Sequence, residues 1–419
     1  MAVVRTMNND LSQLRVAIVH YWLVGMRGGE KVVEALCRLF PQADLYAHAI
    51  RPEALSPTLL AHSIHTTFIQ KLPGAATRFR SYLPLMPLAL EQLDLRDYDL
   101  VISSESGPAK GVIVRADVPH ICYCHSPMRY LWDMHQDYLE SAGPVARLFM
   151  RFFFHRLRLW DYASAQRPDL IIANSKTVAR RIRRWWGREP QLIYPPVDVD
   201  RFAAPDMDSL QKVPGHPRAG GYYLCFGELV SYKRVDLAVR ACTEKGAPLV
   251  VAGDGPERRR LEAMAGPSVV FTGRVPDSAV PALYAGCRAF LFPGEEDFGI
   301  TPVEAMAAGR PVIAYGKGGA RETVREGATG LFFSAQTVES LGAALDAFEK
   351  DEDAFQAEAC RRRARAFDAS VFEEKFAAEV RDILNAAGKE WAEKAPSSAT
   401  QGDALPARTD SLRTLLPGG

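Results

Sequence analysis

Two glutamates with seven residues between them flank a potential anion-binding loop. Glu296 and Glu304 lie on either side of the segment Phe298–Thr301, which leads from a glycine-bearing loop into a predicted helix. A helix N-terminus offers unpaired backbone N–H groups, which favour an anion. Spacing alone leaves a second interpretation open, in which Glu304 only caps the helix and Glu296 is a solvated loop acid.

The helix expected after this loop has recognisable ends. Thr301 is predicted as its N-cap and Pro302 as its first residue, and Glu304 at the third helical position would complete a capping box. Gly309 and Pro311 predict its end. The free N–H groups would therefore lie between the two glutamates.

Three further candidates follow predicted strands in the first half of the chain. Gly28 and Gly29 lie between a strand over 14–20 and a helix over 30–40, and His125 directly follows a strand over 119–124. Glycine lets the backbone approach a ligand, and imidazole can orient a substrate or move a proton. Ligands collect at the carboxyl ends of parallel strands, so we expect one shared rim. A tight turn without a ligand and a structural histidine are the alternatives.

Two cations begin the second half of the chain. Lys233 and Arg234 lie near the start of a helix that follows a strand over 221–226, where they could neutralise a diphosphate. A solvated surface lysine is the alternative. We expect no metal ion and no cofactor, because no Asp-x-Asp motif lies at a plausible strand end.

The elements that must position these residues predict an α/β fold. Short apolar runs alternate with amphipathic stretches from end to end, which indicates βα units and parallel sheets. A proline-rich exit from a strand, Tyr194-Pro-Pro-Val, marks a boundary between domains over 1–197 and 198–370. Residues 392–419 are rich in Pro, Ser, Gly and Thr and are expected to be disordered.

Composition narrows the class of protein. The 419 residues are 47% hydrophobic and carry a formal net charge of +1, which implies no global attraction to nucleic acid. The seven cysteines are scattered, and residues 1–10 lack an apolar leader segment. No run reaches the ~18 apolar residues that span a bilayer. We therefore expect a reducing, cytoplasmic location.

Basic and aromatic residues occur together over 147–160. Such a composition suits a helix face that contacts anionic lipid. The residues predicted to form this face are Arg147, Arg151, Arg156 and Arg158, with Phe152–Phe154 and Trp160. A core-facing helix with a solvated basic side is one alternative, and a nucleic-acid surface is another, although no RNA- or DNA-binding motif is recognised.

The sequence Glu-Asp-Phe-Gly-Ile-Thr-Pro-Val-Glu-Ala-Met-Ala-Ala-Gly-Arg-Pro-Val, which begins at Glu296, resembles the E-x7-E signature of retaining GT-B glycosyltransferases of the family 4 type. The resemblance implies two facing Rossmann-like domains with a cleft between them. It also implies that Glu296 touches the donor sugar and that Glu304 binds the ribose hydroxyls. The backbone cradling the diphosphate would be that of Phe298, Gly299, Ile300 and Thr301.

The same resemblance assigns residues outside the signature. It implies catalytic roles for His125 and Lys233 beside Glu296. The further substrate-binding residues that it implies are Gly28, Gly29, Arg234, Gly253 and Val275. A helix over 371–391 would cross back to the first domain. Relatives often carry arginine where this chain has Glu228, so either Arg234 or another cation replaces that charge, or the donor is handled differently.

The first half contains Arg-Gly-Gly-Glu-Lys-Val and Cys-His-Ser-Pro-Met-Arg-Tyr-Leu-Trp-Asp, and it looks most like mannosyltransferases of bacterial surface-polysaccharide assembly. This implies a retaining, metal-independent hexosyltransferase that uses GDP-mannose. The implied acceptor is a polyprenyl-diphosphate-linked saccharide at the cytoplasmic face of the inner membrane, and no nucleic acid is expected. A UDP-sugar donor, a GT-B sugar-nucleotide epimerase and a non-catalytic binding subunit are the alternatives.

Overall fold

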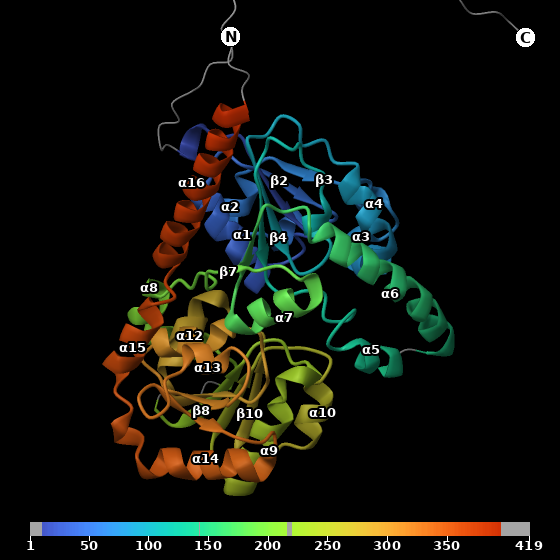
Figure 1. Cartoon of the computed structure of the whole chain (residues 1–419). Helices are drawn as coiled ribbons and strands as arrows, with labels where there is room; N and C mark the ends of the chain where they lie inside the picture. The colour runs from blue at the N-terminus through green and yellow to red at the C-terminus, as the bar shows by residue number, and fades with distance from the viewer. Residues whose placement is uncertain (1–10, 142, 216–219, 395–419) are drawn as a thin grey trace, which may run out of the picture.

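The computed structural model describes residues 11–141, 143–215 and 220–394, which form two sheets covered by helices (Figure 1). Within these ranges the first sheet has seven strands in the order β3-β2-β1-β4-β5-β6-β7. The strands are β1 Val16–His20, β2 Asp44–Ala47, β3 Ile64–Thr66, β4 Leu100–Glu105, β5 His120–Cys124, β6 Leu170–Ala173 and β7 Gln191–Leu192. Of the tail expected over 392–419, residues 395–419 lie outside the described ranges.

The second sheet has six strands among the described residues, in the order β10-β9-β8-β11-β12-β13. They are β8 Tyr222–Phe226, β9 Leu249–Ala252, β10 Val269–Gly273, β11 Cys287–Phe292, β12 Val312–Tyr315 and β13 Gly330–Phe333. Neighbouring strands pair in parallel in both sheets. The predicted α/β fold with parallel sheets is confirmed.

Helices cover both faces of each sheet, so the central strands are apolar at nearly every position. The first domain contains α1 Gly28–Leu39, α2 Pro57–Leu60, α3 Ala75–Arg78, α4 Met86–Glu91, α5 His135–Ser141, α6 Pro144–Ser164 and α7 Lys176–Trp186. The later helices are α8 Asp200–Ala203, α9 Val235–Lys245, α10 Arg258–Ala263, α11 Val280–Ala285, α12 Ile300–Ala307, α13 Ala320–Thr323, α14 Val338–Lys350, α15 Ala357–Arg365 and α16 Ala369–Lys394.

The chain crosses between the domains twice, and the two crossings lie side by side. The N–H of Val197 donates to the carbonyl of Phe367 at 3.0 Å, and the N–H of Ala369 donates to the carbonyl of Val197 at 3.0 Å. After the second crossing, α16 runs along the first domain (Figure 1). Its Phe372 and Phe376 are buried in the core beneath α1. Burial of each phenylalanine contributes about 1.5–3 kcal/mol, which fastens α16 to that domain.

None of the helices in the described part of the chain is long and apolar enough to cross a membrane.

Candidate active site

A cavity of about 420 Å³ lies between the two sheets, and we call it the cleft cavity. It is bordered by the carboxyl end of β5, the start of α1 and the loop from β11 to α12. The structure brings together nine of the predicted residues around it: Gly28, Gly29, His125, Lys233, Glu296, Phe298, Gly299, Ile300 and Thr301. Four segments distant in sequence therefore converge on one site.

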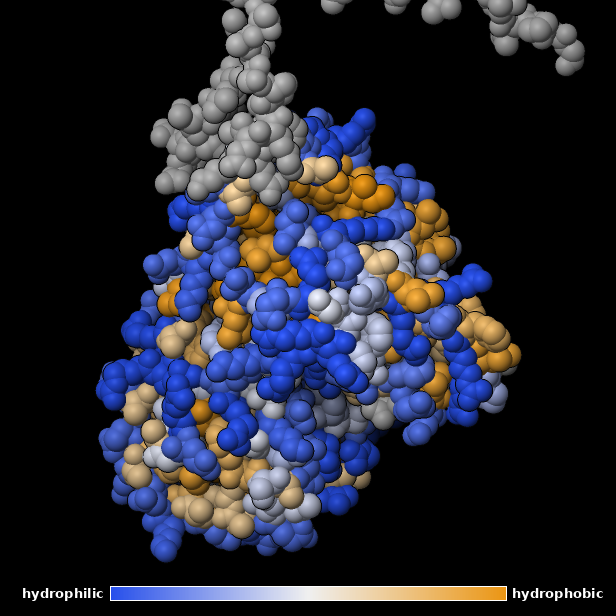
Figure 2. Space-filling model, viewed as in Figure 1, coloured by the Kyte–Doolittle hydropathy of each residue, from blue (hydrophilic) through white to orange (hydrophobic). Residues whose placement is uncertain are grey.

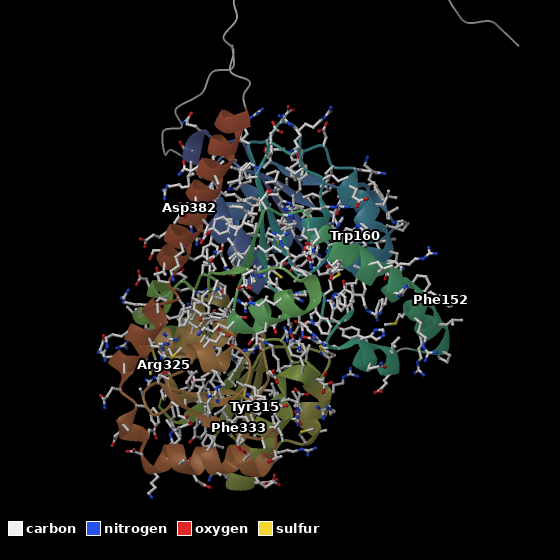
Figure 3. The ribbon with its side chains drawn as sticks, viewed as in Figure 1. Phe152, Trp160, Tyr315, Arg325, Phe333 and Asp382 are labelled. Atoms are coloured by element: carbon white, nitrogen blue, oxygen red, sulfur yellow. The ribbon has the colours of Figure 1, made fainter. Side chains whose placement is uncertain are left out.

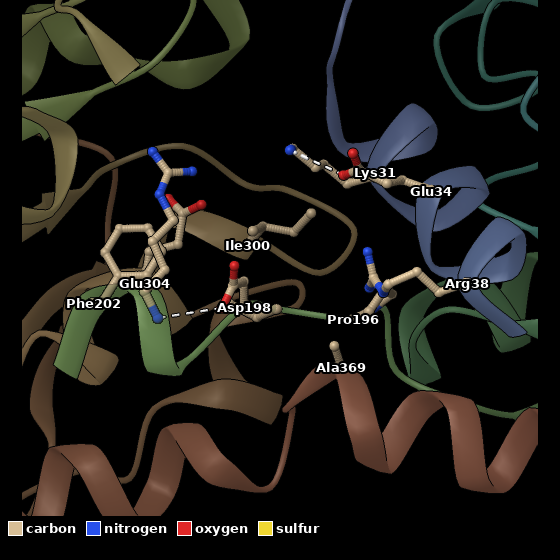
Figure 4. Close-up of a pocket in the computed structure, with 11 residues that line it drawn as sticks. Lys31, Glu34, Arg38, Pro196, Asp198, Phe202, Ile300, Glu304 and Ala369 are labelled. Carbon is tan, nitrogen blue, oxygen red and sulfur yellow. Dashed lines mark hydrogen bonds and ion pairs between the residues drawn. The ribbon is translucent and has the colours of Figure 1, made fainter. Parts of the chain in front are cut away.

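Glu304 lines a second cavity of about 330 Å³, the side cavity (Figure 4). Lys31 and Arg38 of α1 face it from the first domain, and Phe202 of α8 borders it from the second. Ile300 lines both cavities, so the two cavities lie next to each other at the first turn of α12.

Three predicted residues lie outside both cavities. Arg234 has a left-handed backbone (φ 51°), and its guanidinium pairs with Asp236 at 3.1 and 3.2 Å. Gly253 is required for packing, since a Cβ atom there would lie 1.9 Å from the carbonyl oxygen of Gly227. Val275 is half-buried against the core of the second domain. The predicted substrate-binding roles of Gly253 and Val275 would depend on their backbone groups and not on their side chains.

The predicted start of α12 is wrong by two residues. The helix begins at Ile300, and its N-cap is Gly299, which offers no side-chain cap. Gly299 has φ 81°, and a Cβ atom there would lie 2.9 Å from the Phe292 ring, so only glycine fits. The capping box is therefore absent, and the Glu304 carboxylate instead accepts a hydrogen bond from the Tyr284 hydroxyl at 2.9 Å. The first-turn N–H groups of α12 thus open onto the cleft cavity without a side-chain acceptor.

Lys233 and Glu296 form an ion pair at the floor of the cleft cavity, with 3.3 Å between Nζ and Oε1. Burial lowers the pKa of Lys233, but the Glu296 carboxylate and the Tyr232 hydroxyl outweigh this and raise it. The ammonium is therefore charged at neutral pH. A cation, a carboxylate and a helix N-terminus share one cavity.

His125 is held by a chain of hydrogen bonds below the cavity. Its Nε2 atom lies 2.8 Å from the Ser104 hydroxyl, which lies 3.0 Å from Nδ1 of His20. Burial lowers the pKa of His125 to about 4, so the ring is neutral at pH 7. Nδ1 is the ring nitrogen left for a substrate. A Cβ atom on Gly29 would lie 3.7 Å from Nε2 of His125 and 2.7 Å from the Tyr21 hydroxyl, which explains the glycine.

Among the side chains at the cleft cavity that were not predicted, two have a buried polar atom without a hydrogen-bond partner in the described part of the chain. Arg129 lines it with a buried Nε atom, and Asn174 with a buried Oδ1 atom. Neither atom has a hydrogen-bond partner among the described residues. The signal for Arg129 in the sequence is its place in the segment Cys-His-Ser-Pro-Met-Arg-Tyr-Leu-Trp-Asp, four residues after His125. Buried polar atoms without partners are costly, so both are suited to contact a ligand.

Charges on α7 tie the first domain to the loop that carries Glu296. The Arg181 guanidinium bridges Asp297 in that loop and Asp133 of its own domain. At the start of α7, the Glu322 carboxylate of the second domain accepts the N–H of Lys176 at 2.9 Å. A third pair across the cleft joins Arg27 to Glu228 at 3.5 Å. Glu228 thus stands opposite a cation of the facing domain.

A buried ion cluster fixes the end of α6 to β4. The Lys110 ammonium lies 2.5 Å from Asp161 and 3.5 Å from Glu105, and all three side chains are fully buried. Asp161 also accepts the indole N–H groups of Trp132 and Trp186, each at 2.8 Å. Burial raises the pKa of Glu105 to about 7, although Lys110 opposes this. The cluster lies away from the cleft cavity and supports the helix.

Known proteins resemble both halves of the chain. Residues 26–201 match the family described as Glycosyltransferase Family 4, and residues 206–367 match Glycosyl transferases group 1. A "GDP-mannose-dependent alpha-(1-6)-phosphatidylinositol monomannoside mannosyltransferase" of Mycolicibacterium smegmatis is 33% identical over 227 residues, 49% of this chain and 56% of that protein. A "GDP-mannose-dependent alpha-mannosyltransferase" of the same organism is 34% identical over 188 residues, 43% of this chain and 48% of that protein. This chain spans about half the length of these curated relatives.

Solved structures resemble the whole fold. HepE of Anabaena, in complex with UDP and glucose, has a TM-score of 0.68 and 18% identity. The likeness covers 88% of this chain and 100% of HepE.

Proposed function

The chain is a glycosyltransferase of the GT-B type, with a Glycosyltransferase Family 4 domain followed by a Glycosyl transferases group 1 domain, and on this premise we propose that it transfers mannose from GDP-mannose to a lipid-linked saccharide. The observation that carries the proposal is the convergence of Lys233, Glu296 and the N-terminus of α12 on the cleft cavity. In the proposed complex the diphosphate lies against Lys233 and α12, and the sugar lies against Glu296.

The proposed chemistry is stabilisation of the leaving diphosphate. Negative charge grows on that group as the glycosidic bond breaks, and a buried ammonium and a helix N-terminus both favour it. We propose a metal-independent reaction with retention, in which the acceptor hydroxyl attacks from the face that the diphosphate leaves. His125 orients the sugar through Nδ1, since a ring with a pKa of about 4 is a weak base at neutral pH.

The nucleoside is proposed to occupy the side cavity. There the Glu304 carboxylate, already held by Tyr284, would accept hydrogen bonds from the ribose hydroxyls. Two relatives with GDP-mannose in their names support the choice of donor, and the UDP complex of HepE keeps a UDP-sugar as the alternative.

The test is release of nucleotide from a donor in the presence of an acceptor. The full chain is incubated with GDP-mannose and a polyprenyl-diphosphate-linked saccharide, with UDP-glucose and UDP-galactose as parallel donors. We expect GDP to appear only when donor and acceptor are both present, with a mannosylated lipid as the second product. Formation of an epimerised sugar nucleotide without acceptor would replace the proposal by the epimerase alternative.

The acceptor is proposed to be presented at a membrane surface, which α6 contacts. On the outer half of this helix Leu148, Phe149 and Phe152 are 59%, 58% and 72% exposed. Figure 3 shows Phe152 at the outer end of α6, away from the body of the protein, whereas Trp160 lies at the inner end. Hydrophobic side chains gather at this edge of the surface (Figure 2). Exposed apolar groups of this size are unusual on a solvated helix.

The composition of that face differs from the sequence prediction. Arg158 is half-buried and donates to the carbonyl of Leu131 at 2.8 Å, and Arg147 donates to the carbonyl of Leu139 at 2.9 Å. Phe154 is buried, and Phe153 and Trp160 pack against the same core cluster, so these three rings do not belong to the exposed face. The face consists of Leu148, Phe149, Arg151, Phe152, Arg156 and Leu159, and we call it the α6 face. Two cations beside four large apolar side chains suit the interface of an anionic bilayer. We propose a peripheral location on the cytoplasmic side of the membrane.

A further inference from the structure

A third cavity between the domains is lined mainly by cations, and we call it the basic cavity. It has a volume of about 540 Å³ and lies between the start of α7 and the segment from β12 to α13. Figure 2 shows hydrophilic side chains concentrated over α7 and α13, where the two domains meet. The cations that line it are Lys176, Arg180, Lys317, Arg321, Arg325 and Arg363.

The charges around this cavity are not balanced. Two carboxylates, Glu295 and Glu322, face six cations in a chain whose formal net charge is only +1. The Glu322 carboxylate already accepts hydrogen bonds from the backbone N–H groups of Lys176 and Thr177, at 2.9 and 3.2 Å. Within the described ranges none of the six cations forms an ion pair with a carboxylate.

The cations are held in place, and they repel one another. Arg363 donates to the carbonyl oxygens of Thr323, at 2.7 Å, and of Glu322. Burial and the charge of Arg325 lower the pKa of Arg363. Like charges gathered in a partly enclosed space cost free energy unless an anion joins them. Guanidinium groups pair with phosphate through two parallel hydrogen bonds, and four of the six cations are arginines.

We propose that the basic cavity binds a soluble small molecule that carries two or more phosphate charges, such as a diphosphate or a sugar bisphosphate. This site is distinct from the cleft cavity, because the two share no lining residue. It draws cations from both domains, with Lys176 and Arg180 on α7 and Arg321 and Arg325 at α13. The bound anion therefore joins the domains.

The basic cavity also lies directly behind the loop that carries Glu296. Lys317 and Gly318 line it, and the next residue, Gly319, donates its N–H to the carbonyl of Glu296 at 2.8 Å. A Cβ atom on Gly319 would lie 2.2 Å from the carbonyl oxygen of Phe298, so the two loops are in backbone contact. An anion in the basic cavity thus steadies the backbone of Glu296. This consequence rests on the proposed function, whereas the binding itself does not.

The test uses inorganic pyrophosphate as the probe and calorimetry as the readout. Because pyrophosphate also suits the donor site, the measurement is made on the full chain carrying Lys233→Ala, in which that site is impaired. We expect binding to persist there, and to weaken at least about tenfold when Arg321→Gln and Arg325→Gln are added, since each change removes charge-assisted hydrogen bonds. The matched control adds Arg259→Gln and Arg362→Gln, which remove the same charge from exposed positions outside the cavity, and should leave binding unchanged.

Three outcomes would decide against the proposal. Loss of pyrophosphate binding in Lys233→Ala alone would show that only the donor site binds it. Equal weakening by the two double variants would show an effect of net charge. Reduced sedimentation of Arg321→Gln/Arg325→Gln with anionic vesicles would make the cavity a lipid contact instead. GDP binding is also measured with Arg321→Gln/Arg325→Gln in the otherwise wild-type chain. We expect GDP binding to be unaltered there, which would show that the donor site is intact and that failure of this proposal is separate from failure of the proposed function.

Discussion

The Nζ atom of Lys233 lies 3.3 Å from Oε1 of Glu296, so the cation proposed to bind the diphosphate and the carboxylate proposed to bind the sugar pair with each other. Both side chains are largely buried, which strengthens their attraction and fixes their positions. A donor must insert its diphosphate and sugar on either side of this pair. The two side chains are thus ordered by the fold, and binding of the donor does not have to supply the free energy of ordering them.

Lys233→Ala should weaken the donor at least about tenfold, because a charge-assisted phosphate contact contributes on the order of 1.5–3 kcal/mol. Calorimetric titration with GDP measures it. Arg234→Gln is the matched control, since Arg234 pairs with Asp236 outside the cavities and its loss should leave GDP affinity unchanged. Equal losses in the two variants would return the diphosphate contact to Arg234.

Glu296→Gln should lower kcat more than it weakens GDP, since this carboxylate is assigned to the sugar. Glu304→Gln should show the opposite pattern, because the side cavity is assigned to the nucleoside and the amide accepts ribose hydroxyls less well. Steady-state kinetics and GDP titration of both variants provide the comparison. If Glu296→Gln lost GDP binding instead, the two roles would be reversed.

Arg129→Gln should raise the KM of a phosphate-bearing substrate by about tenfold or more, because its buried Nε atom has no hydrogen-bond partner among the described residues. Arg184→Gln, an exposed arginine on α7 outside the cleft cavity, is the control. Thermal unfolding should change little in either variant. A KM equal to that of the wild type would assign Arg129 to the Asp297 contact alone, which measures 4.0 Å.

Binding to vesicles should increase with anionic lipid and decrease with salt. Each cation near an anionic surface contributes about 1 kcal/mol, so Arg151→Gln with Arg156→Gln should weaken binding by more than tenfold. Phe149→Ser with Phe152→Ser should weaken it on neutral and anionic vesicles alike. Arg240→Gln with Arg259→Gln, on the second domain, is the control for net charge. If none of the substitutions on the α6 face changed sedimentation with vesicles, that face would be assigned to a protein partner instead.

Stability should fall as the pH is lowered below 6.5, and His48 is one source of this loss. Burial lowers the pKa of His48 to about 3, below its ordinary value of 6.5, so the unfolded chain takes up the proton first. The contribution is present above pH 6.5 and is lost progressively down to about pH 3. His48→Asn keeps a donor or acceptor for Thr67, which lies 3.0 Å from Nδ1. Its unfolding free energy should change less steeply between pH 6 and 4, by up to about 1.4 kcal/mol per pH unit. If the unfolding free energies of the wild type and of His48→Asn changed with pH at the same slope, His48 would be excluded as a source of the acid-induced loss of stability.

The strand-to-helix loops were predictable because local sequence marks them. The glycines at 28, 29 and 299 and the apolar runs before them belong to single βα units, and the order of strands in parallel sheets brings such loops to one rim. The start of α12 differs from the prediction for a tertiary reason. Thr301 and Glu304 match the sequence pattern of a capping box, but the Phe292 ring and the left-handed backbone of Gly299 make the helix begin at Ile300. Tertiary contacts overrode the local preference.

Contacts across the cleft could not be predicted from the chain alone. Arg181 and Asp297 lie 116 residues apart and meet only because α7 reaches the second domain. Arg158 follows Arg151 by two helical turns and so shares its side of α6, yet one bonds to Leu131 and the other is exposed, because only the inner end of the helix is covered. Helical periodicity gives the side of a helix but not how far a neighbour extends along it.

The paired crossings at Val197 and Ala369 determine how the two domains can move. Backbone hydrogen bonds link Val197 to Phe367 and to Ala369, so the two connecting segments cannot separate independently. Any rotation of the second domain relative to the first would therefore use both connections as one hinge. Opening this hinge must break the Arg27–Glu228 and Arg181–Asp297 pairs in the same motion, since both span the gap that widens. If the proposed transfer is correct, this single motion is the one that would release product and admit the next donor.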